Sequence, residues 1–374
     1  MRVLHIYKTS ILDSVGGVEQ VIHQIAKGIS KAGAIVDVLS LTSKNVPRVL
    51  ELDGYFSHRA RQNFQIFSTG FSASALIRFR QLARSADLIH YHFPWPFMDI
   101  LHFSKMLKKP SIVTYHSDIV RQKKLLLVYK PLMNAFLKDV DRIVATSPNY
   151  LLTSETLNTF KNKTSVIPIG LEENSYKSTS TEKLNFWKEK FGEKFFLFVG
   201  VLRYYKGLHN LISAAVGCDY QFVIVGSGPI EAELKEQVNK LGLTNVHFLG
   251  FLSDDDKNAL LTLCFAVLFP SNLRSEAFGV SLLEGAMYGK PMISSEIGTG
   301  TTFININYET GLVVSPDNPN ALKTAINYLW ENPDEATAMG LAAKLRFRKY
   351  FTADKMVNSY LKLYSDLLDN KKRA

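Results

Sequence analysis

Cysteine is scarce in this chain, because its 374 residues include only Cys218 and Cys264. Two thiols do not build a disulfide framework or a cysteine metal cluster, so the count predicts a reducing compartment. Long apolar runs are also missing, since the longest candidate, Phe195–Leu202, is far shorter than the ~20 residues that span a membrane. His5 and Lys8 interrupt the first apolar stretch. This favours an initial strand over a signal peptide.

Acidic residues are few in one part of the chain. Residues 55–142 hold 14 Lys/Arg and 5 Asp/Glu, so this stretch carries nearly all of the net charge of +10. Such a surface attracts nucleic acid, acidic lipid headgroups or phosphorylated substrates. Nucleic acid is disfavoured, because the sequence has no helix-turn-helix, zinc finger or aromatic RNA-binding strand pattern. A solvated basic face without a partner stays open as an alternative.

Strand and helix patterns alternate along the chain, whose 46% hydrophobic content is typical of a folded protein and whose length predicts two domains. The expected strands lie at 3–7, 35–39, 87–92, 111–116, 142–147, 163–169, 195–200, 221–226, 246–250, 266–269 and 291–294. This rhythm predicts an α/β fold with two doubly wound parallel sheets and a cleft between them. We expect one domain over 1–172, a polar linker over 173–194 and a second domain over 195–352. The last helix, 353–374, is expected to pack back on the first domain.

The segment after the strand at 266–269 has the features of a binding site. Its loop carries Glu276, and a helix then opens at Gly279 and carries Glu284 about one turn inside. A helix N-terminus that follows a loop presents free N–H groups, which suit a diphosphate. The two carboxylates are then placed to hold hydroxyl-rich groups on either side of it, such as a sugar and a ribose.

With this segment, the chain resembles glycosyltransferase family 4, the retaining sugar-nucleotide transferases of the GT-B fold, in which two Rossmann-like domains face each other across a cleft. The resemblance covers nearly the whole chain. Its motifs are Gly16-Gly17-Val18-Glu19, Tyr115-His116-Ser117-Asp118, Val199-Gly200 through Lys206-Gly207, Gly226-Ser227-Gly228-Pro229, and the segment from Glu276 to Glu284 with Phe278, Gly279 and Val280. The stretches 269–279 and 295–303 resemble bacterial O-antigen and exopolysaccharide transferases, notably mannosyl- and rhamnosyltransferases that use GDP-sugars.

The resemblance implies roles for individual residues. Glu276 would contact the transferred sugar, and His116 would lie near that sugar and the reaction centre, so both are expected to be catalytic. Glu284 would bind the ribose hydroxyls, and Lys206 would neutralise the donor diphosphate. The other residues expected to bind the donor are Gly16, Gly17, Phe278, Gly279 and Val280.

One position departs from the family pattern. The phosphate-binding arginine of the family is replaced here by Val201. Arg203, two residues further along the same loop, is the candidate substitute, and whether it takes that role stays open.

Acceptor binding is expected at the end of the strand over 87–92. His90 and His92 would either contact the acceptor or pack the loop, and both interpretations stay open. Trp95 would be a platform on which a sugar stacks, and Asp118 follows His116 in the same motif.

No metal ion or cofactor is expected. Asp139-Val-Asp141 and Asp254-Asp255-Asp256 match the Asp-x-Asp pattern of metal-dependent transferases. The first directly precedes a strand and the second begins a helix, where acidic residues suit the helix dipole. Structural use is therefore favoured for both, and cations together with the helix end would stabilise the departing diphosphate.

These features predict a hexosyltransferase that moves mannose from GDP-mannose, with retention, onto a lipid-linked oligosaccharide of an O-antigen or exopolysaccharide. The alternatives are GDP-rhamnose or a UDP-hexose as donor, a GT-B sugar-nucleotide epimerase, and a non-catalytic protein that binds nucleic acid or lipid. The enzyme is expected to be cytoplasmic and peripherally bound to the anionic inner face of the membrane. The stretch Arg121–Lys138 interleaves cations with apolar residues and would dock there, although ordinary core packing explains its pattern equally well.

Overall fold

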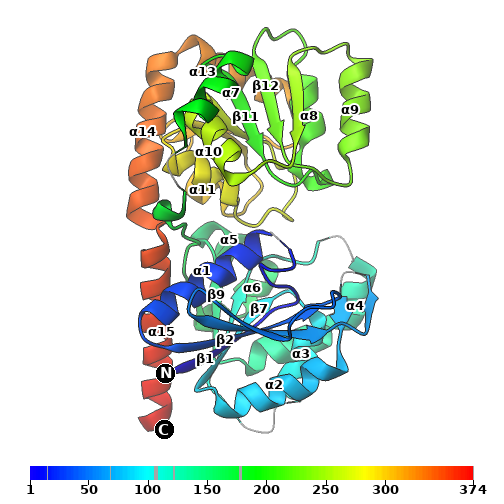
Figure 1. The fold of residues 1–374 in the computed structure, drawn as a ribbon, viewed down its shortest axis with the longest axis vertical. Helices are drawn as coiled ribbons and strands as arrows, with labels where there is room; N and C mark the ends of the chain where they lie inside the picture. The colour runs from blue at the N-terminus through cyan, green and yellow to red at the C-terminus, as the bar shows by residue number, and fades with distance from the viewer. Residues whose placement is uncertain (15, 68, 105–107, 121–122, 177–178, 374) are drawn as a thin grey trace. The chain divides into compact units, whose positions relative to one another are not determined.

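The computed structural model describes residues 1–373 apart from residues 15, 68, 105–107, 121–122 and 177–178 (Figure 1). It divides the chain into two compact units. The first unit consists of residues 1–170 and 353–374, and the second unit consists of residues 171–352. The first unit is thus interrupted in sequence by the whole of the second.

An eight-stranded sheet forms the centre of the first unit, with the strand order β10-β9-β8-β7-β1-β2-β4-β3. Its strands are β1 (Arg2–Ile6), β2 (Ile35–Thr42), β3 (Val49–Leu52), β4 (Tyr55–Arg61), β7 (Leu88–Phe93), β8 (Ser111–Tyr115), β9 (Arg142–Ala145) and β10 (Thr164–Val166). All neighbours pair in parallel except β3 and β4. The strand order reverses between β1 and β7, and in doubly wound sheets ligands bind beyond the carboxyl ends of the strands at such a point.

Helices and a hairpin complete the first unit. The helices are α1 (Gly17–Lys31), α2 (Ala73–Ser85), α3 (Pro96–Phe103), α4 (Lys123–Asp139), α5 (Pro148–Thr153), α6 (Glu155–Thr159) and α15 (Ala353–Arg373), with a short turn η1 (Lys161–Lys163). The hairpin of β5 (Phe64–Ile66) and β6 (Thr69–Phe71) lies outside the main sheet. The sequence rhythm predicted neither this hairpin nor the antiparallel β3.

The last helix packs against the first one. A Cβ atom on Gly28 of α1 would lie 2.4 Å from Cγ2 of Val357 on α15, so the missing side chain allows the two helices to approach closely. Apolar residues of α1 at helical spacing, Val21, Ile22, Ile25, Ala26 and Ile29, are buried. The C-terminal helix therefore lies on the first unit, as expected.

The second unit has a six-stranded, wholly parallel sheet with the order β13-β12-β11-β14-β15-β16. Its strands are β11 (Phe195–Val199), β12 (Gln221–Val225), β13 (Val246–Gly250), β14 (Ala266–Phe269), β15 (Met292–Ser295) and β16 (Gly311–Val314). Its helices are α7 (Thr181–Phe191), α8 (Leu208–Ala214), α9 (Glu231–Lys240), α10 (Asp254–Leu263), α11 (Val280–Met287), α12 (Thr301–Ile304), α13 (Pro319–Glu331) and α14 (Pro333–Tyr350), with turns η2 (Glu173–Ser175) and η3 (Tyr204–Lys206).

The prediction of a linker over 173–194 was wrong. It contains α7, whose first turn is capped by Ser180, since its side chain accepts a hydrogen bond from the amide of Lys183. The side chains of Lys183 and Trp187 both donate to Asp256 of α10, at 2.7 and 3.1 Å. The polar Ser/Thr run that suggested a linker is partly a helix cap, and the helix belongs to the second unit.

Within the described residues, no helix combines the length and the apolar character needed to cross a membrane.

Candidate active site

A buried ion pair lies beside the carboxyl ends of two neighbouring strands of the second unit. Lys206 follows β11, Glu276 follows β14, and the two strands pair in parallel. Lys206 Nζ donates to Glu276 Oε2, and only 11% and 12% of the two side chains are exposed. Nζ also lies 4.7 Å from the centre of the Phe269 ring. The structure thus joins two predicted site residues that are 70 positions apart.

A glycine allows this pair to form. Gly207 adopts a left-handed conformation with φ of +66°, and a Cβ atom there would lie 2.0 Å from the carbonyl oxygen of Pro270. Only glycine tolerates both conditions at once. The loop that carries Lys206 can therefore lie directly against the loop that leads to Glu276.

The N-terminus of α11 lies beside the same strand ends. Gly279 precedes the helix with φ of +104°, and no side chain caps it. Ser281 Oγ donates to the carbonyl of Val199 at 2.7 Å, which ties the first turn to the end of β11. The N–H groups of this turn, together with the positive end of the helix dipole, suit an anion.

Two further residues predicted to bind the donor flank Gly279. The Phe278 side chain is buried against Phe351, with 6.2 Å between ring centres, so any contact that it makes with a ligand comes from its backbone. Val280 is half-buried and is the first residue of α11.

Glu284 is buried inside α11 and has two partners that the sequence did not indicate. Tyr176 Oη and Lys257 Nζ donate to Glu284 Oε1 at 3.0 and 2.9 Å. Burial opposes the charge of Lys257, but the Glu284 carboxylate keeps the pKa of Lys257 above its ordinary value. A buried carboxylate needs a counter-charge. However, no local pattern identified Lys257 as its source, and Tyr176 lay in the expected linker.

Arg203 and Val201 are exposed in the loop between β11 and η3. No ion pair of Arg203 occurs within the part of the chain that the structure describes. The structure does not bring Arg203 into the pair of Lys206 and Glu276, so its substitution for the family arginine stays a prediction.

In the first unit, the glycine pair lies at the start of α1. Gly16 is extended, with φ of −107°, and Gly17 is the first helical residue. A Cβ atom on Gly16 would lie 2.3 Å from Glu19 Oε2. Glu19 is itself buried, and Thr9 Oγ1 donates to its carboxylate. Gly16 therefore leaves room for the Glu19 carboxylate to turn back over the beginning of the helix.

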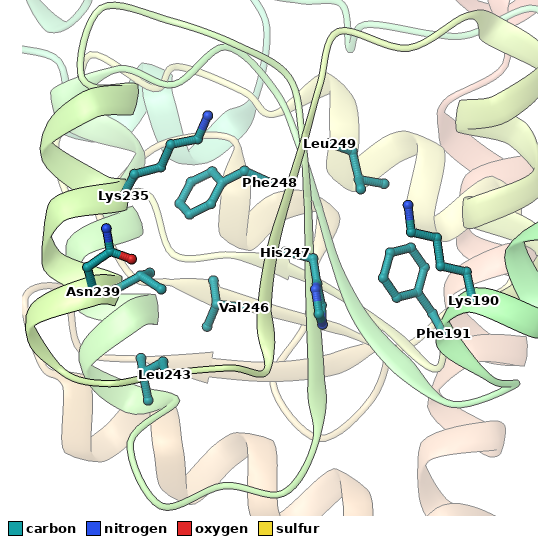
Figure 2. A pocket seen from close by; sticks show the side chains of 10 residues that line it. Lys190, Phe191, Lys235, Asn239, Leu243, Val246, His247, Phe248 and Leu249 are labelled. Atoms are coloured by element: carbon teal, nitrogen blue, oxygen red, sulfur yellow. The ribbon is translucent and has the colours of Figure 1, made fainter.

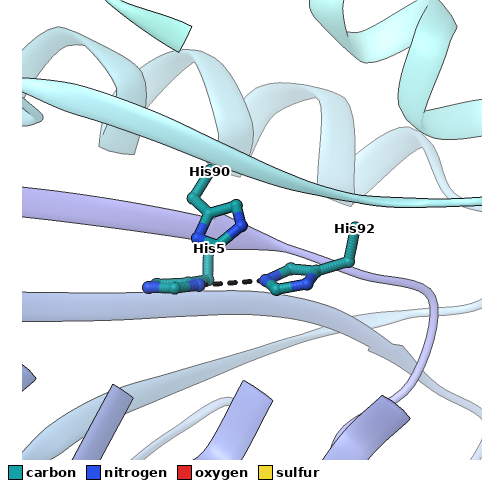
Figure 3. Close-up of side chains that lie close together, drawn as sticks. All are labelled: His5, His90 and His92. Atoms are coloured by element: carbon teal, nitrogen blue, oxygen red, sulfur yellow. Dashed lines mark hydrogen bonds between the residues drawn. The ribbon is translucent and has the colours of Figure 1, made fainter. Parts of the chain in front are cut away.

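Four histidines meet on one face of the first sheet. A hydrogen bond of 3.0 Å joins His5 Nδ1 to His92 Nε2, and another of 3.0 Å joins His92 Nδ1 to His116 Nε2. His90 stacks on His92 with 4.2 Å between ring centres. Its two nitrogens bond to Tyr364 Oη at 2.6 Å and Thr114 Oγ1 at 2.7 Å. His5, His90 and His92 are drawn in Figure 3.

These rings are shielded from water. Three have no exposed surface, and His116 keeps 5%. Burial lowers the pKa of His5 and of His116 to about 3, and it lowers the pKa of His90 and of His92 well below the ordinary value. All four rings are therefore neutral at physiological pH.

For His90 and His92 the structure favours packing over acceptor contact, and it contradicts the stacking role expected of Trp95. His90 and His92 are fully buried, and all of their ring nitrogens bond to protein groups, so they pack the sheet and cannot contact an acceptor. Trp95 is 1% exposed, and its Nε1 donates to the carbonyl of Gly70 at 3.2 Å, so its ring is no stacking platform.

Asp118 is engaged by neighbouring protein groups. Tyr115 Oη and Ser154 Oγ donate to its Oδ1 at 3.0 and 2.8 Å, and its amide donates to Tyr150 Oη at 2.5 Å. Its visible role is to fix the loop after His116.

The Asp-x-Asp matches have the structural roles that were favoured. Asp139 bonds to His102 at 2.7 Å, and Asp141 accepts the amide of Ser111 at 2.8 Å. Ser253 caps α10 by accepting the amide of Asp256 at 3.2 Å.

A pocket lies elsewhere in the second unit. A cavity of about 470 Å³ opens along β13. Figure 2 shows Lys235 and Asn239 on one side of this strand and Lys190 and Phe191 on the other. It contains none of the predicted site residues, so it is not the candidate active site.

Comparisons with known proteins find similar sequences over nearly the whole chain. Residues 15–174 match the sequence family Glycosyltransferase Family 4, and residues 180–346 match the family Glycosyl transferases group 1. The chain is 57% identical over 353 residues to D-rhamnosyltransferase WbpZ of Pseudomonas aeruginosa, covering 94% of this chain and 93% of the relative. It is 48% identical over 374 residues to O-antigen chain mannosyltransferase C of Escherichia coli, covering 99% and 100%.

A solved structure confirms the predicted GT-B fold. Sucrose-phosphate synthase from Thermosynechococcus elongatus superposes with a TM-score of 0.83 at 21% identity, covering 99% of both chains. At this identity the similarity shows the fold alone.

Proposed function

This chain belongs to the glycosyltransferases of group 1 and family 4, and from that premise we propose that it transfers mannose from GDP-mannose, with retention, onto a lipid-linked saccharide of an O-antigen or exopolysaccharide. The observation that carries the proposal is the full-length similarity to an O-antigen chain mannosyltransferase. We place the enzyme in the cytoplasm, on the inner face of the cell membrane.

The charges of the second unit support sugar transfer from a nucleotide diphosphate. Breaking the bond between sugar and phosphate leaves negative charge on the diphosphate and positive character on the sugar. In the proposed complex, Lys206 and the first turn of α11 stabilise the diphosphate as its charge develops. Glu276, released from Lys206 by the incoming phosphates, contacts the sugar. Glu284 binds the ribose with the carboxylate oxygen that Tyr176 and Lys257 leave available.

GDP-rhamnose is the second candidate donor, because the 57% identical relative is a D-rhamnosyltransferase. D-Rhamnose is 6-deoxy-D-mannose, so the two donors differ by one hydroxyl group. A site that hydrogen-bonds that hydroxyl discriminates strongly against the deoxy sugar, whereas an apolar site hardly discriminates. A UDP-hexose and a GT-B epimerase reaction, which needs no acceptor, are the remaining alternatives.

An anionic membrane surface is the proposed docking partner. Leu127 and Val128 on α4 expose 73% and 80% of their surface, although the sequence alone allowed them to be core residues. Lys123 and Lys124 begin the same helix, but their side chains, like the whole of Arg121, lie outside the described residues. Exposed apolar side chains next to cations are typical of a helix that lies in a lipid headgroup layer.

A donor panel tests the proposed function. Purified enzyme is incubated with GDP-[14C]mannose, GDP-rhamnose or a UDP-hexose, with and without a lipid-pyrophosphate saccharide. We expect mannose in the lipid phase only when the acceptor is present, with its α-configuration retained in the product. Faster transfer from GDP-rhamnose would reassign the donor, an altered free sugar nucleotide would indicate an epimerase, and no turnover of any donor would contradict the proposal.

A further inference from the structure

The three hydrogen-bonded rings His5, His92 and His116, hereafter the histidine chain, run from the interior of the first sheet to the loop after β8. We propose that the histidine chain holds His116 in a single tautomer, with its proton on Nδ1, and that His5 and His92 are positioning residues for sugar transfer. The proposal rests on the proposed function only where it places His116 beside the substrate.

Both hydrogen bonds of the histidine chain must be donated in the same direction. Each ring is neutral, since burial lowers the pKa of every histidine in it, and a neutral imidazole carries one N–H and one bare nitrogen. His92 uses both nitrogens within the chain, so it donates to one neighbour and accepts from the other. Therefore only two arrangements are possible, with all protons on Nδ1 or all protons on Nε2.

The buried end of the chain distinguishes these two arrangements. His5 Nε2 is enclosed and has no hydrogen-bond partner. A buried N–H without an acceptor is rarer and more costly than an acceptor without a donor. His5 Nε2 is therefore the bare nitrogen, which puts the proton of His5 on Nδ1. The proton of His92 then also lies on Nδ1 and is donated to His116 Nε2.

At the other end, His116 becomes a hydrogen-bond donor. With Nε2 accepting from His92, the proton of His116 lies on Nδ1. His116 is the one member of the chain with exposed surface, and its Nδ1 is not among the enclosed atoms that lack a partner. Nδ1–H is therefore available to an acceptor oxygen of a bound molecule, either a sugar hydroxyl or a phosphate oxygen.

Neighbouring rings keep the chain in place without setting its direction. His90 stacks on His92 and bonds to the hydroxyl groups of Thr114 and Tyr364. Because a hydroxyl group can donate or accept, either tautomer of His90 is satisfied. His90 thus provides a buried control on the same strand and the same face of the sheet.

Metal binding is the competing explanation for this cluster. One ring nitrogen from each of His5, His90 and His92 lies within 4.8 Å of the others. However, His5 and His92 lie side by side with 18° between their planes and a hydrogen bond between their ring nitrogens, and His90 stacks on His92 at 29°. Metal ligands must direct their in-plane lone pairs at one point, whereas here His5 Nδ1 and His92 Nε2 point at each other and His90 lies over His92 (Figure 3). The geometry therefore favours hydrogen bonding between rings.

Nitrogen NMR of the nine histidines tests the tautomer directly. The full chain is labelled with 15N-histidine, and long-range proton–nitrogen correlations distinguish protonated from bare ring nitrogens. Resonances are assigned by single substitutions. We expect His5, His92 and His116 to be neutral Nδ1–H tautomers between about pH 6 and pH 8. A proton on Nε2 of His116 would overturn the proposal, and so would Zn²⁺ binding that shifts the His5, His90 and His92 resonances at one equivalent.

Substitution at His92 tests the positioning role. In His92→Phe, His116 loses the donor to its Nε2, and we expect a mixture of tautomers and a fall in kcat of about tenfold, the effect of one hydrogen bond. In His92→Gln, the amide can accept from His5 and donate to His116, so we expect the tautomer and most of kcat to be restored. The matched control His90→Gln should leave the His116 tautomer unchanged even if it lowers stability.

The two proposals fail in distinguishable ways. The NMR result does not depend on the donor or on activity, so it can contradict the tautomer while transfer is intact. A folded His92→Phe variant with an unchanged His116 tautomer, or His92→Gln and His92→Phe variants with equal kcat, would overturn the positioning role.

Discussion

The predicted site residues of the two units lie among buried polar groups of different kinds. The second unit buries charges in pairs, Lys206 with Glu276 and Lys257 with Glu284. The first unit buries histidines that hydrogen-bond to one another and stay neutral, while the segment that gives the protein its excess of positive charge belongs to the same unit. Charged pairs can exchange partners with a charged ligand, whereas neutral rings can only donate or accept a hydrogen bond. The comparison assigns the diphosphate to the second unit.

Low pH should destabilise the first unit more than the second, and this is the largest of the expected effects. His5 and His116 have pKa values of about 3 in the folded state against 6.5 in the unfolded chain, and those of His90 and His92 are also lowered. The unfolded chain therefore binds more protons, and stability is complete above about pH 6.5 and falls as the pH decreases. Below that pH, each histidine lowers the free energy of unfolding by about 1.4 kcal/mol per pH unit. The loss of stability is measured by amide hydrogen exchange, with β1 and β7 compared with β11 and β12 at each pH. Equal losses in both units would contradict the comparison.

Removal of one buried cation should have the next largest effect. Lys206→Ala removes the charge that stabilises the departing diphosphate, and we expect kcat to fall about 100- to 1,000-fold. Lys183→Ala is the matched control, because Lys183 is also paired with an acid of the second unit, Asp256. Steady-state kinetics with both variants decides the matter. If both lysines prove equally dispensable, the charge assignment is wrong.

Substitutions of the two glutamates should affect different quantities, donor affinity for Glu284 and kcat for Glu276. Glu284→Ala removes one or two hydrogen bonds to a charged group, about 1.5–3 kcal/mol each, so donor affinity should fall at least tenfold. Glu276→Ala should chiefly lower kcat, because it contacts the sugar whose charge changes. Calorimetric titration of the donor, alongside kinetics, measures both. An unchanged affinity in folded Glu284→Ala would remove the ribose assignment.

Sequence patterns predicted the periodic parts of the molecule and missed its long-range contacts. Helix and strand periods located both sheets, the strand–loop–helix context singled out Glu276, and the family resemblance singled out Lys206. The partners of Glu284 were missed, because Tyr176 is 108 residues away and Lys257 is 27 residues away. His90 was expected at a strand end, but it lies in the middle of β7, where Tyr364, 274 residues later, covers it. A strand pattern predicts that a face exists and does not tell which distant helix covers that face.

Exposed apolar residues of α4 in the first unit should contribute more to membrane binding than those of α14 in the second unit. Replacing Leu127 and Val128 by Ser should lower binding to anionic vesicles about tenfold or more, since burial of one large apolar side chain contributes about 1.5–3 kcal/mol. The control replaces Leu341 and Leu345 of α14, which are also exposed, at 60% and 68%. Sedimentation with vesicles at low and moderate salt measures both. Equal release by the two double changes would mean that general hydrophobicity, not α4, drives binding.

Metal removal should have the smallest effect. The diphosphate charge is met by Lys206 and the N-terminus of α11, and the acids of both Asp-x-Asp matches bond to protein groups. Activity should therefore persist in EDTA. Loss of activity in EDTA, followed by recovery with Mn²⁺ or Mg²⁺, would show that a metal ion carries part of that charge.

The packing of α15 on α1 has a consequence for how the protein is made. The ribosome synthesises the first sheet early, then the whole second unit, and only then the helix that supplies Tyr360 and Tyr364. Until then His90 lacks its bond to Tyr364, and Gly28 lacks the side chain of Val357 that packs against it. The unit that is begun first is completed last, so the second unit can fold during translation while the first waits for the final helix. A nascent chain that stops after residue 352 would leave the face of the first sheet next to the histidine chain uncovered.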